Sequence, residues 1–170
     1  MMLRSLESIL SGKAPEIGRG WLSALRAAEK LGALNAFSDR ELLSVHEEIV
    51  RKLARWFEMA ADKNEIGAFF VMMGKEYCAL GVPVSELTWA LALDRKAFVD
   101  YMLENEEMEG AYRMYALMDA ADRAADFFLL GAYYLTKGFL EETFLRMRKG
   151  EKLSDDILGK YFKDDFFFKD

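Results

Sequence analysis

Residues 126–142, DFFLLGAYYLTKGFLEE, decide the fold, because they form an apolar stretch inside a chain that is 31% charged. No charged residue interrupts the run from Phe127 to Thr136, which lies between Asp126 and Lys137. A membrane span needs roughly 20 mostly apolar residues, about twice the length of this run. The stretch therefore predicts a buried helix and no membrane span.

The helix that contains this stretch is predicted to be long, since no strong helix breaker occurs between residues 108 and 149. One helix or two in tandem fit the pattern, with Gly131 and Gly138 as the expected bends. Apolar and small residues recur along it at alternating steps of four and three, as in a heptad seam. They are Met114, Met118, Ala121, Ala125, Phe128, Ala132, Leu135 and Phe139.

A second row lies one position before the first and contains many small side chains, which would let another helix approach closely. It comprises Leu117, Ala120, Ala124, Phe127, Gly131, Tyr134 and Gly138. A helix that is apolar on two faces has two partners to pack against. We expect one face to pack on the core and this second row to form a homodimer interface. The alternative is a helix at the centre of a monomeric bundle.

The rest of the chain also reads as helix, because only two prolines occur and no segment alternates apolar and polar residues over the length of a strand. A short helix is predicted from about Met2 to Leu10, and a second one starts near Pro15. The pattern predicts an all-α bundle of about six helices with a long C-terminal helix.

Local signals mark where the middle helices begin and end. Ser38 and Glu41 form a capping box at the start of one helix. Gly81 is expected to end the next helix, and Pro83 to open the one after it. Two apolar stripes at helical spacing follow from these boundaries: Leu42, His46, Ile49, Leu53, Phe57 and Ala60 on one helix, and Leu87, Leu91, Asp94, Phe98 and Met102 on another.

Length and composition favour one domain in a reducing compartment. With 170 residues, 52% of them hydrophobic, the chain can bury one core, and we assign residues 1–150 to a single helical domain. The net charge of −6, with basic residues dispersed among acidic ones, argues against a nucleic-acid partner. The lone cysteine, Cys78, excludes an internal disulfide and is typical of the cytoplasm.

Residues 151–170 are predicted to be a short helical tail that ends in aromatic and acidic residues. Phe166, Phe167 and Phe168 stand between acids there. They can dock on a partner or fold back onto the subunit, and folding back is the simpler interpretation.

Two polar residues interrupt the apolar stripes. His46, the only histidine, is a candidate haem ligand or pH switch, and the simpler interpretation is a hydrogen-bonded histidine within the bundle. Asp94 must be exposed at a helix end or paired, and we expect an ion pair with an arginine.

No catalytic or metal motif occurs at a recognised spacing, so we expect no enzyme activity. Asp119, Asp122 and Asp126 share a helix face and could hold a hard cation, but such a row is more typical of a solvated face paired with Arg123 or Arg95. Ten methionines and many aromatic residues would suit a pocket for a small apolar ligand, and they suit an ordinary core equally well.

The order of helices resembles a known family. Trp21 and Leu25 on an early helix are followed by ELLSVHEEIVRKLARWFE at 41–58, KEYCALGVPVSELTWALALDRKAFVDYM at 75–102 and FFLLGAYYLTKGFLEE at 127–142. From about residue 15 to 146 this is similar to the N-terminal sensory domain of the RsbT co-antagonist proteins of the stressosome and of related bacterial histidine kinases. The matching positions are the step from Gly81 to Glu86 and, in the last helix, Tyr133, Tyr134, Gly138, Phe139, Glu141 and Glu142.

The resemblance implies a globin-like regulatory domain that dimerises and passes a signal through its last helix, often without haem. One departure concerns Leu129, which stands where the family usually has an acid, so no role for that acid is carried over. The family's output domain has no counterpart in the 170 residues.

These observations lead to one expected function and two alternatives. We expect a non-enzymatic bacterial sensor domain in stress signalling, cytoplasmic and homodimeric, that relays a signal through its last helix to a protein partner without a cofactor. The first alternative is a globin-like sensor that binds haem or a small apolar ligand using His46. The second is a structural module for protein interaction.

Overall fold

The computed structural model describes residues 2–58, 61–104 and 111–149 of the chain. They form five α-helices and one short 3-10 helix: α1 Met2–Ala27, η1 Leu34–Ala36, α2 Asp39–Phe57, α3 Lys63–Ala79, α4 Val84–Glu104 and α5 Ala111–Arg148. No strand occurs among the described residues, which confirms the predicted all-helical class. The globin-like arrangement implied by the resemblance stays a prediction.

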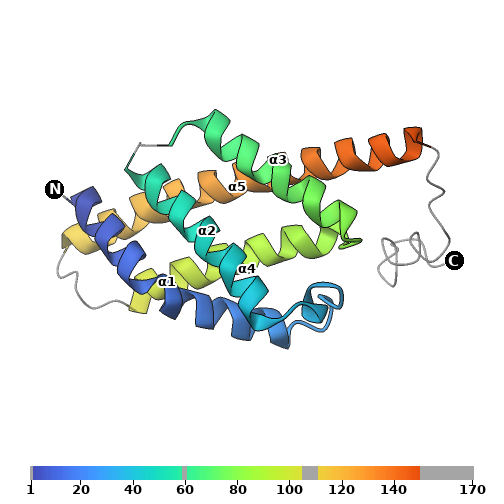
Figure 1. Cartoon of the computed structure of the whole chain (residues 1–170). Coiled ribbons are helices and arrows are strands. Elements are labelled where there is room, and N and C mark those ends of the chain that lie inside the picture. Colours follow the sequence, from blue (N-terminus) through green and yellow to red (C-terminus); the bar gives the residue numbers. More distant parts are fainter. Residues whose placement is uncertain (1, 59–60, 105–110, 150–170) are drawn as a thin grey trace, which may run out of the picture.

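The long helix α5 packs against three of the other four α-helices. It packs against α3, α4 and α2, while α1 packs on α2 and α4. In Figure 1 the last turns of α5 extend past the ends of α3 and α4. One continuous core, built from all five helices, fills the space between them.

The N-terminal helix differs from the prediction. A single helix, α1, covers the two segments that were expected to be separate, and Pro15 lies inside it. Proline inside a helix removes one intrahelical hydrogen bond and crowds the carbonyl four residues before it, yet the turns on both sides of Pro15 remain helical. The prediction of a break before Pro15 was therefore wrong.

The other predicted boundaries are confirmed. The Ser38 hydroxyl accepts a hydrogen bond from the Glu41 N–H, and the Glu41 carboxylate accepts one from the Ser38 N–H, which completes the capping box. Gly81 follows α3 with φ +76°, a conformation that glycine adopts without strain. α4 begins directly after Pro83. The described members of the two predicted stripes are buried on α2 and α4.

Two charged side chains fix the connection between α1 and α2. Arg26 donates to the carbonyls of Asn35 and Phe37 at 3.0 and 2.8 Å. The Glu86 carboxylate, in the first turn of α4, accepts from the N–H groups of Ala33 and Leu34 at 3.2 and 3.0 Å. Glu86 therefore holds this connection on α4 by binding backbone groups that would otherwise need water.

The contact between α3 and α5 depends on two glycines. A Cβ atom added at Gly74 would lie 2.1 Å from the Leu135 carbonyl oxygen, and one added at Gly138 would lie 2.1 Å from that of Val71. The two helix backbones therefore touch directly, as only glycine allows. α5 continues through Gly131 and Gly138, so neither of the predicted bends divides it into two helices.

Candidate functional site

The first candidate site is a pair of buried polar side chains, His46 on α2 and Asp94 on α4. His46 Nδ1 lies 2.5 Å from Asp94 Oδ1, and the two side chains are 1% and 2% exposed. The expected arginine partner of Asp94 is replaced by this histidine, 48 positions earlier in the chain. That prediction was wrong because helix packing, which periodicity does not give, selects the partner.

Helix α1 closes over this pair. The Trp21 indole stacks on the imidazole of His46, with ring centroids 4.9 Å apart and an interplanar angle of 16°. Trp21 Nε1 also donates to the Ala90 carbonyl on α4 at 3.2 Å. One tryptophan therefore ties α1 to both helices that carry the pair, and we call Trp21, His46 and Asp94 the interior polar site.

Two polar atoms of the interior polar site have no hydrogen-bond partner among the described residues. They are His46 Nε2 and Asp94 Oδ2, both buried. Burial raises the pKa of the Asp94 carboxyl, and its hydrogen bond to His46 opposes that shift. A buried polar atom without a partner typically costs about 1–3 kcal/mol. The site therefore lowers stability relative to an apolar core of the same shape.

A small cavity joins the interior polar site to α5. Its volume is about 30 Å³, and its lining includes Trp21, Asp94, Tyr77 and Leu135. Burial raises the pKa of Tyr77 to about 12, so this phenol stays neutral near physiological pH. The cavity has room for water but is far smaller than the roughly 300–1,000 Å³ typical of ligand pockets.

The surroundings of His46 do not fit a haem group. A Cβ atom added at Gly18 of α1 would lie 3.4 Å from His46 Nε2 and 3.0 Å from Cδ2. The backbone of α1 thus occupies the space beside Nε2, while Asp94 holds Nδ1 and Trp21 covers the ring face. A porphyrin coordinated by His46 would have to displace α1.

The acidic row on α5 is exposed and makes no metal site. Asp119, Asp122 and Asp126 all lie on the solvent side of the helix. Arg123, one of their expected partners, donates to the Phe57 carbonyl at 2.9 Å. Among the described residues, no group of three or more His, Cys, Asp or Glu side chains is arranged to hold a metal ion.

The row predicted as a homodimer interface packs inside the subunit. Ala120, Ala124 and Phe127 are fully buried. At Gly131 an added Cβ would meet the Phe70 ring, at Gly138 the Val71 backbone, and the Tyr134 ring covers Gly67. Leu117 is half-buried. Because α3 of the same chain already covers most of this row, a subunit interface needs other residues. Phe166, Phe167 and Phe168 lie outside the described residues.

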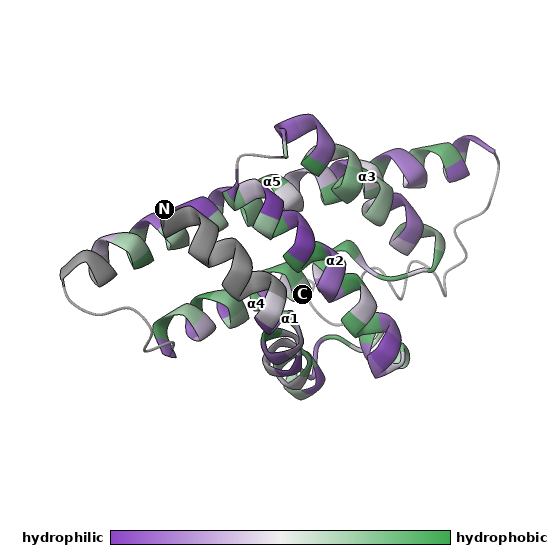
Figure 2. Cartoon of the chain, turned by 60° about the vertical axis from the view of Figure 1, so that its left-hand side comes forward, coloured by the Kyte–Doolittle hydropathy of each residue, from purple (hydrophilic) through white to green (hydrophobic). Residues whose placement is uncertain are grey.

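The opposite side of α5 is the second candidate site. Seven large apolar side chains lie there, each more than half exposed: Tyr115, Met118, Leu129, Tyr133, Leu140, Phe144 and Met147. We call this surface the outer face. In Figure 2 the apolar turns of α5 continue almost to its C-terminal end, which closes with a hydrophilic turn. Sequence periodicity had assigned only Met118 of this surface to a stripe.

Among the described residues, no helix combines the length and apolar character that crossing a membrane requires. Comparison with family models, with curated proteins and with solved structures finds no match for the chain.

Proposed function

We propose that the chain is a non-enzymatic regulatory domain that forms a homodimer through the outer face of α5 and relays a signal along this helix to a protein partner. The observation that supports the proposal is the outer face itself. It holds seven of the twelve large apolar side chains that are exposed among the described residues. Five of these seven follow one another along the second half of the outer face: Leu129, Tyr133, Leu140, Phe144 and Met147. Contiguous apolar patches mark sites of protein interaction, whereas isolated exposed apolar residues do not.

The interior polar site is the proposed point at which the signal acts. It joins α1, α2 and α4, and the adjoining cavity reaches Leu135 on α5. A signal that changes the hydrogen bonding or charge of His46 and Asp94 would favour one packing of α5 over another, which is a population shift between two states. A cytoplasmic role in bacterial stress signalling, implied by the family resemblance, is part of this proposal.

Light scattering tests the dimer. The unmodified chain is expected to be a dimer at micromolar concentration, and Leu140→Lys, which places a charge on the outer face, to be a folded monomer. Leu103→Lys is the matched control, because Leu103 on α4 is 57% exposed and Leu140 is 60% exposed. The control is expected to remain a dimer. A monomeric unmodified chain would contradict the proposal.

The relay is tested by the dissociation constant of the dimer. Asp94→Asn alters the interior polar site and touches no residue of the outer face, so a change of about threefold or more would indicate coupling through α5. Asp100→Asn is the control, since Asp100 pairs with Lys96 on the exposed side of the same helix. Equal constants for the three proteins would remove the relay and leave a simple interaction module.

A further inference from the structure

The outer face has two halves of different character. Residues at alternating steps of four and three run along it as a heptad pattern: Tyr115, Asp119, Asp122, Asp126, Leu129, Tyr133, Thr136, Leu140, Thr143 and Met147. Met118 and Phe144 lie beside this pattern. Its first half carries the three exposed aspartates, and its second half, over residues 129–147, carries apolar and threonine side chains. A second copy can therefore bury the second half without covering carboxylates.

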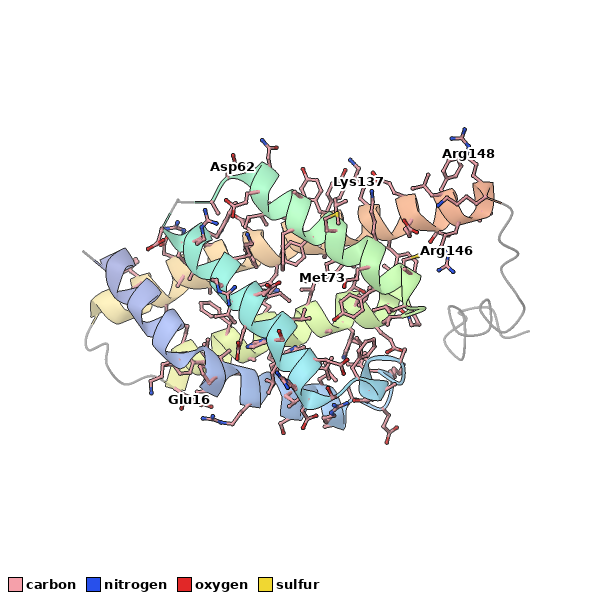
Figure 3. The ribbon with its side chains drawn as sticks, viewed as in Figure 1. Glu16, Asp62, Met73, Lys137, Arg146 and Arg148 are labelled. Atoms are coloured by element: carbon pink, nitrogen blue, oxygen red, sulfur yellow. The ribbon has the colours of Figure 1, made fainter. Side chains whose placement is uncertain are left out.

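Positive charge is concentrated just beyond the apolar half. Arg148 and Lys149 are both exposed at the C-terminal end of α5. In Figure 3 Lys137 and Arg148 point away from the other helices, whereas Arg146 points to the opposite side, where it donates to the Cys78 carbonyl. Along the outer face the order is thus acidic, apolar and then Arg148, whereas Lys149, eleven positions or about three turns after Gly138, lies on the side toward α3.

We propose that two copies of the chain pair through their outer faces in antiparallel orientation, with residues 129–147 of one α5 against residues 129–147 of the other. This inference rests on the proposed homodimer and adds its geometry. In a parallel pair, Asp119, Asp122 and Asp126 would each face their own copy across the seam. In the antiparallel pair, Asp126 lies level with the C-terminal end of the second α5, close to Arg148, and Asp119 and Asp122 lie beyond that end, outside the seam.

The heptad pattern sets the register of the antiparallel pair. Leu129 lies opposite Met147 of the second copy, Tyr133 opposite Thr143, and Thr136 opposite Leu140. Each of these three pairs then occurs twice in the dimer, because a two-fold axis relates the two copies. The overlap is about 27 Å long at a rise of ~1.5 Å per residue. The last turns of α5 extend past α3 and α4, so this end of the helix is accessible (Figure 1).

Disulfide trapping tests the orientation. Leu129→Cys and Met147→Cys are prepared as single variants and combined in one chain, and all three are oxidised at micromolar concentration. The combined variant is expected to form a covalent dimer. Each single variant is expected to remain uncrosslinked, since identical positions lie about 27 Å apart in the antiparallel pair and a disulfide needs Cβ atoms within roughly 4.5 Å. The unmodified chain is the control for Cys78, which is buried.

Each result of the trapping experiment has one meaning. Covalent dimers of both single variants would show a parallel pair and overturn the inference. No covalent dimer of the combined variant, while light scattering still shows a dimer, would overturn the register and the orientation but leave the proposed homodimer intact. A monomeric unmodified chain would remove the homodimer and this inference together.

Removing charges gives a second test, because the affinity of the dimer should change in opposite directions for the antiparallel and the parallel orientation. Asp126→Asn and Arg148→Gln are each expected to weaken an antiparallel dimer by roughly 3-fold, because each variant loses the attraction between Asp126 and Arg148 across the interface. Both would tighten a parallel dimer by relieving repulsion between like charges. Glu48→Gln removes one exposed charge from α2 and controls for the change in net charge. Tighter binding by both interface variants, beyond this control, would overturn the inference.

Discussion

The two sides of α5 are both apolar, yet they differ in side-chain size and in what they contact. The side toward α3 carries Gly131 and Gly138 and touches another backbone, whereas the outer face carries large side chains such as Leu129 and Tyr133 that are exposed. Small residues let a helix of the same chain come close, and large apolar residues remain on the side that is open to another molecule. The size of apolar residues, as well as their spacing, therefore distinguishes internal packing from an association surface.

Adding a single methyl group on the inner side should have the largest effect. Gly138→Ala places a Cβ atom where the Val71 carbonyl oxygen lies, so the helices must separate, and we expect a loss of at least about 3 kcal/mol in the free energy of unfolding. Urea denaturation followed by circular dichroism measures it. Gly20→Ala is the matched control, because nothing lies within 4 Å of its added Cβ. This control should gain about 0.5–1 kcal/mol from helix propensity. Equal stabilities of the two variants would contradict the close contact.

Substitutions in the interior polar site should have the second-largest effect on the free energy of unfolding. Asp94→Ala leaves both nitrogens of His46 buried without a partner and should cost about 2 kcal/mol in the free energy of unfolding. The double variant His46→Leu/Asp94→Ala removes both polar groups and should be more stable than Asp94→Ala alone. Denaturation of the two single variants and the double variant gives the coupling free energy. If the losses of the two single variants add up to the loss of the double variant, the contact between His46 and Asp94 makes no specific contribution to stability.

The raised pKa of Asp94 predicts a pH dependence with a definite sign. The folded state favours the protonated form of the Asp94 carboxyl. The contribution of Asp94 to stability is therefore complete when the pH is below the pKa of this carboxyl in the unfolded chain, near 3.9. The contribution is lost as the pH rises toward the higher folded pKa, by about 1.4 kcal/mol per pH unit. Asp94→Asn does not titrate. Denaturation at pH 4, 5.5 and 7 should therefore show the unmodified chain losing stability relative to this variant as the pH rises. A constant difference would contradict the pKa shift.

Substitution on the outer face should have the smallest effect on the folded subunit. Leu129→Ser removes an exposed side chain, so the free energy of unfolding at nanomolar concentration should change by less than about 0.5 kcal/mol. The unmodified dimer should unfold at a higher temperature as its concentration increases, because association stabilises the folded state. The variant should lose this dependence. Thermal unfolding over a hundredfold range of concentration measures both effects, and an equal dependence for the two proteins would place the interface elsewhere.

Local signals in the sequence were sufficient for most of the helices but not for their contacts. The capping box at Ser38 and the turn at Gly81 depend on neighbouring residues, so both were predictable. The choice of face on α5 was not, because both sides carry apolar residues at helical spacing, and only the match between Gly74 and Gly138 decides which side faces α3. For the same reason His46 and Asp94 were recognised as unusual, while their pairing required the packing of α2 on α4.

The direct backbone contact at Gly138 makes α5 an unequal lever. If α5 tilts as a rigid rod about this crossing, Arg148 lies about 15 Å from the fulcrum and Ala111 about 40 Å on the other side. A tilt that moves the C-terminal end by about 1 Å would move the N-terminal end by about 2.7 Å in the opposite direction. A small change of angle between α3 and α5 would thus produce its largest displacement at the N-terminal end of α5.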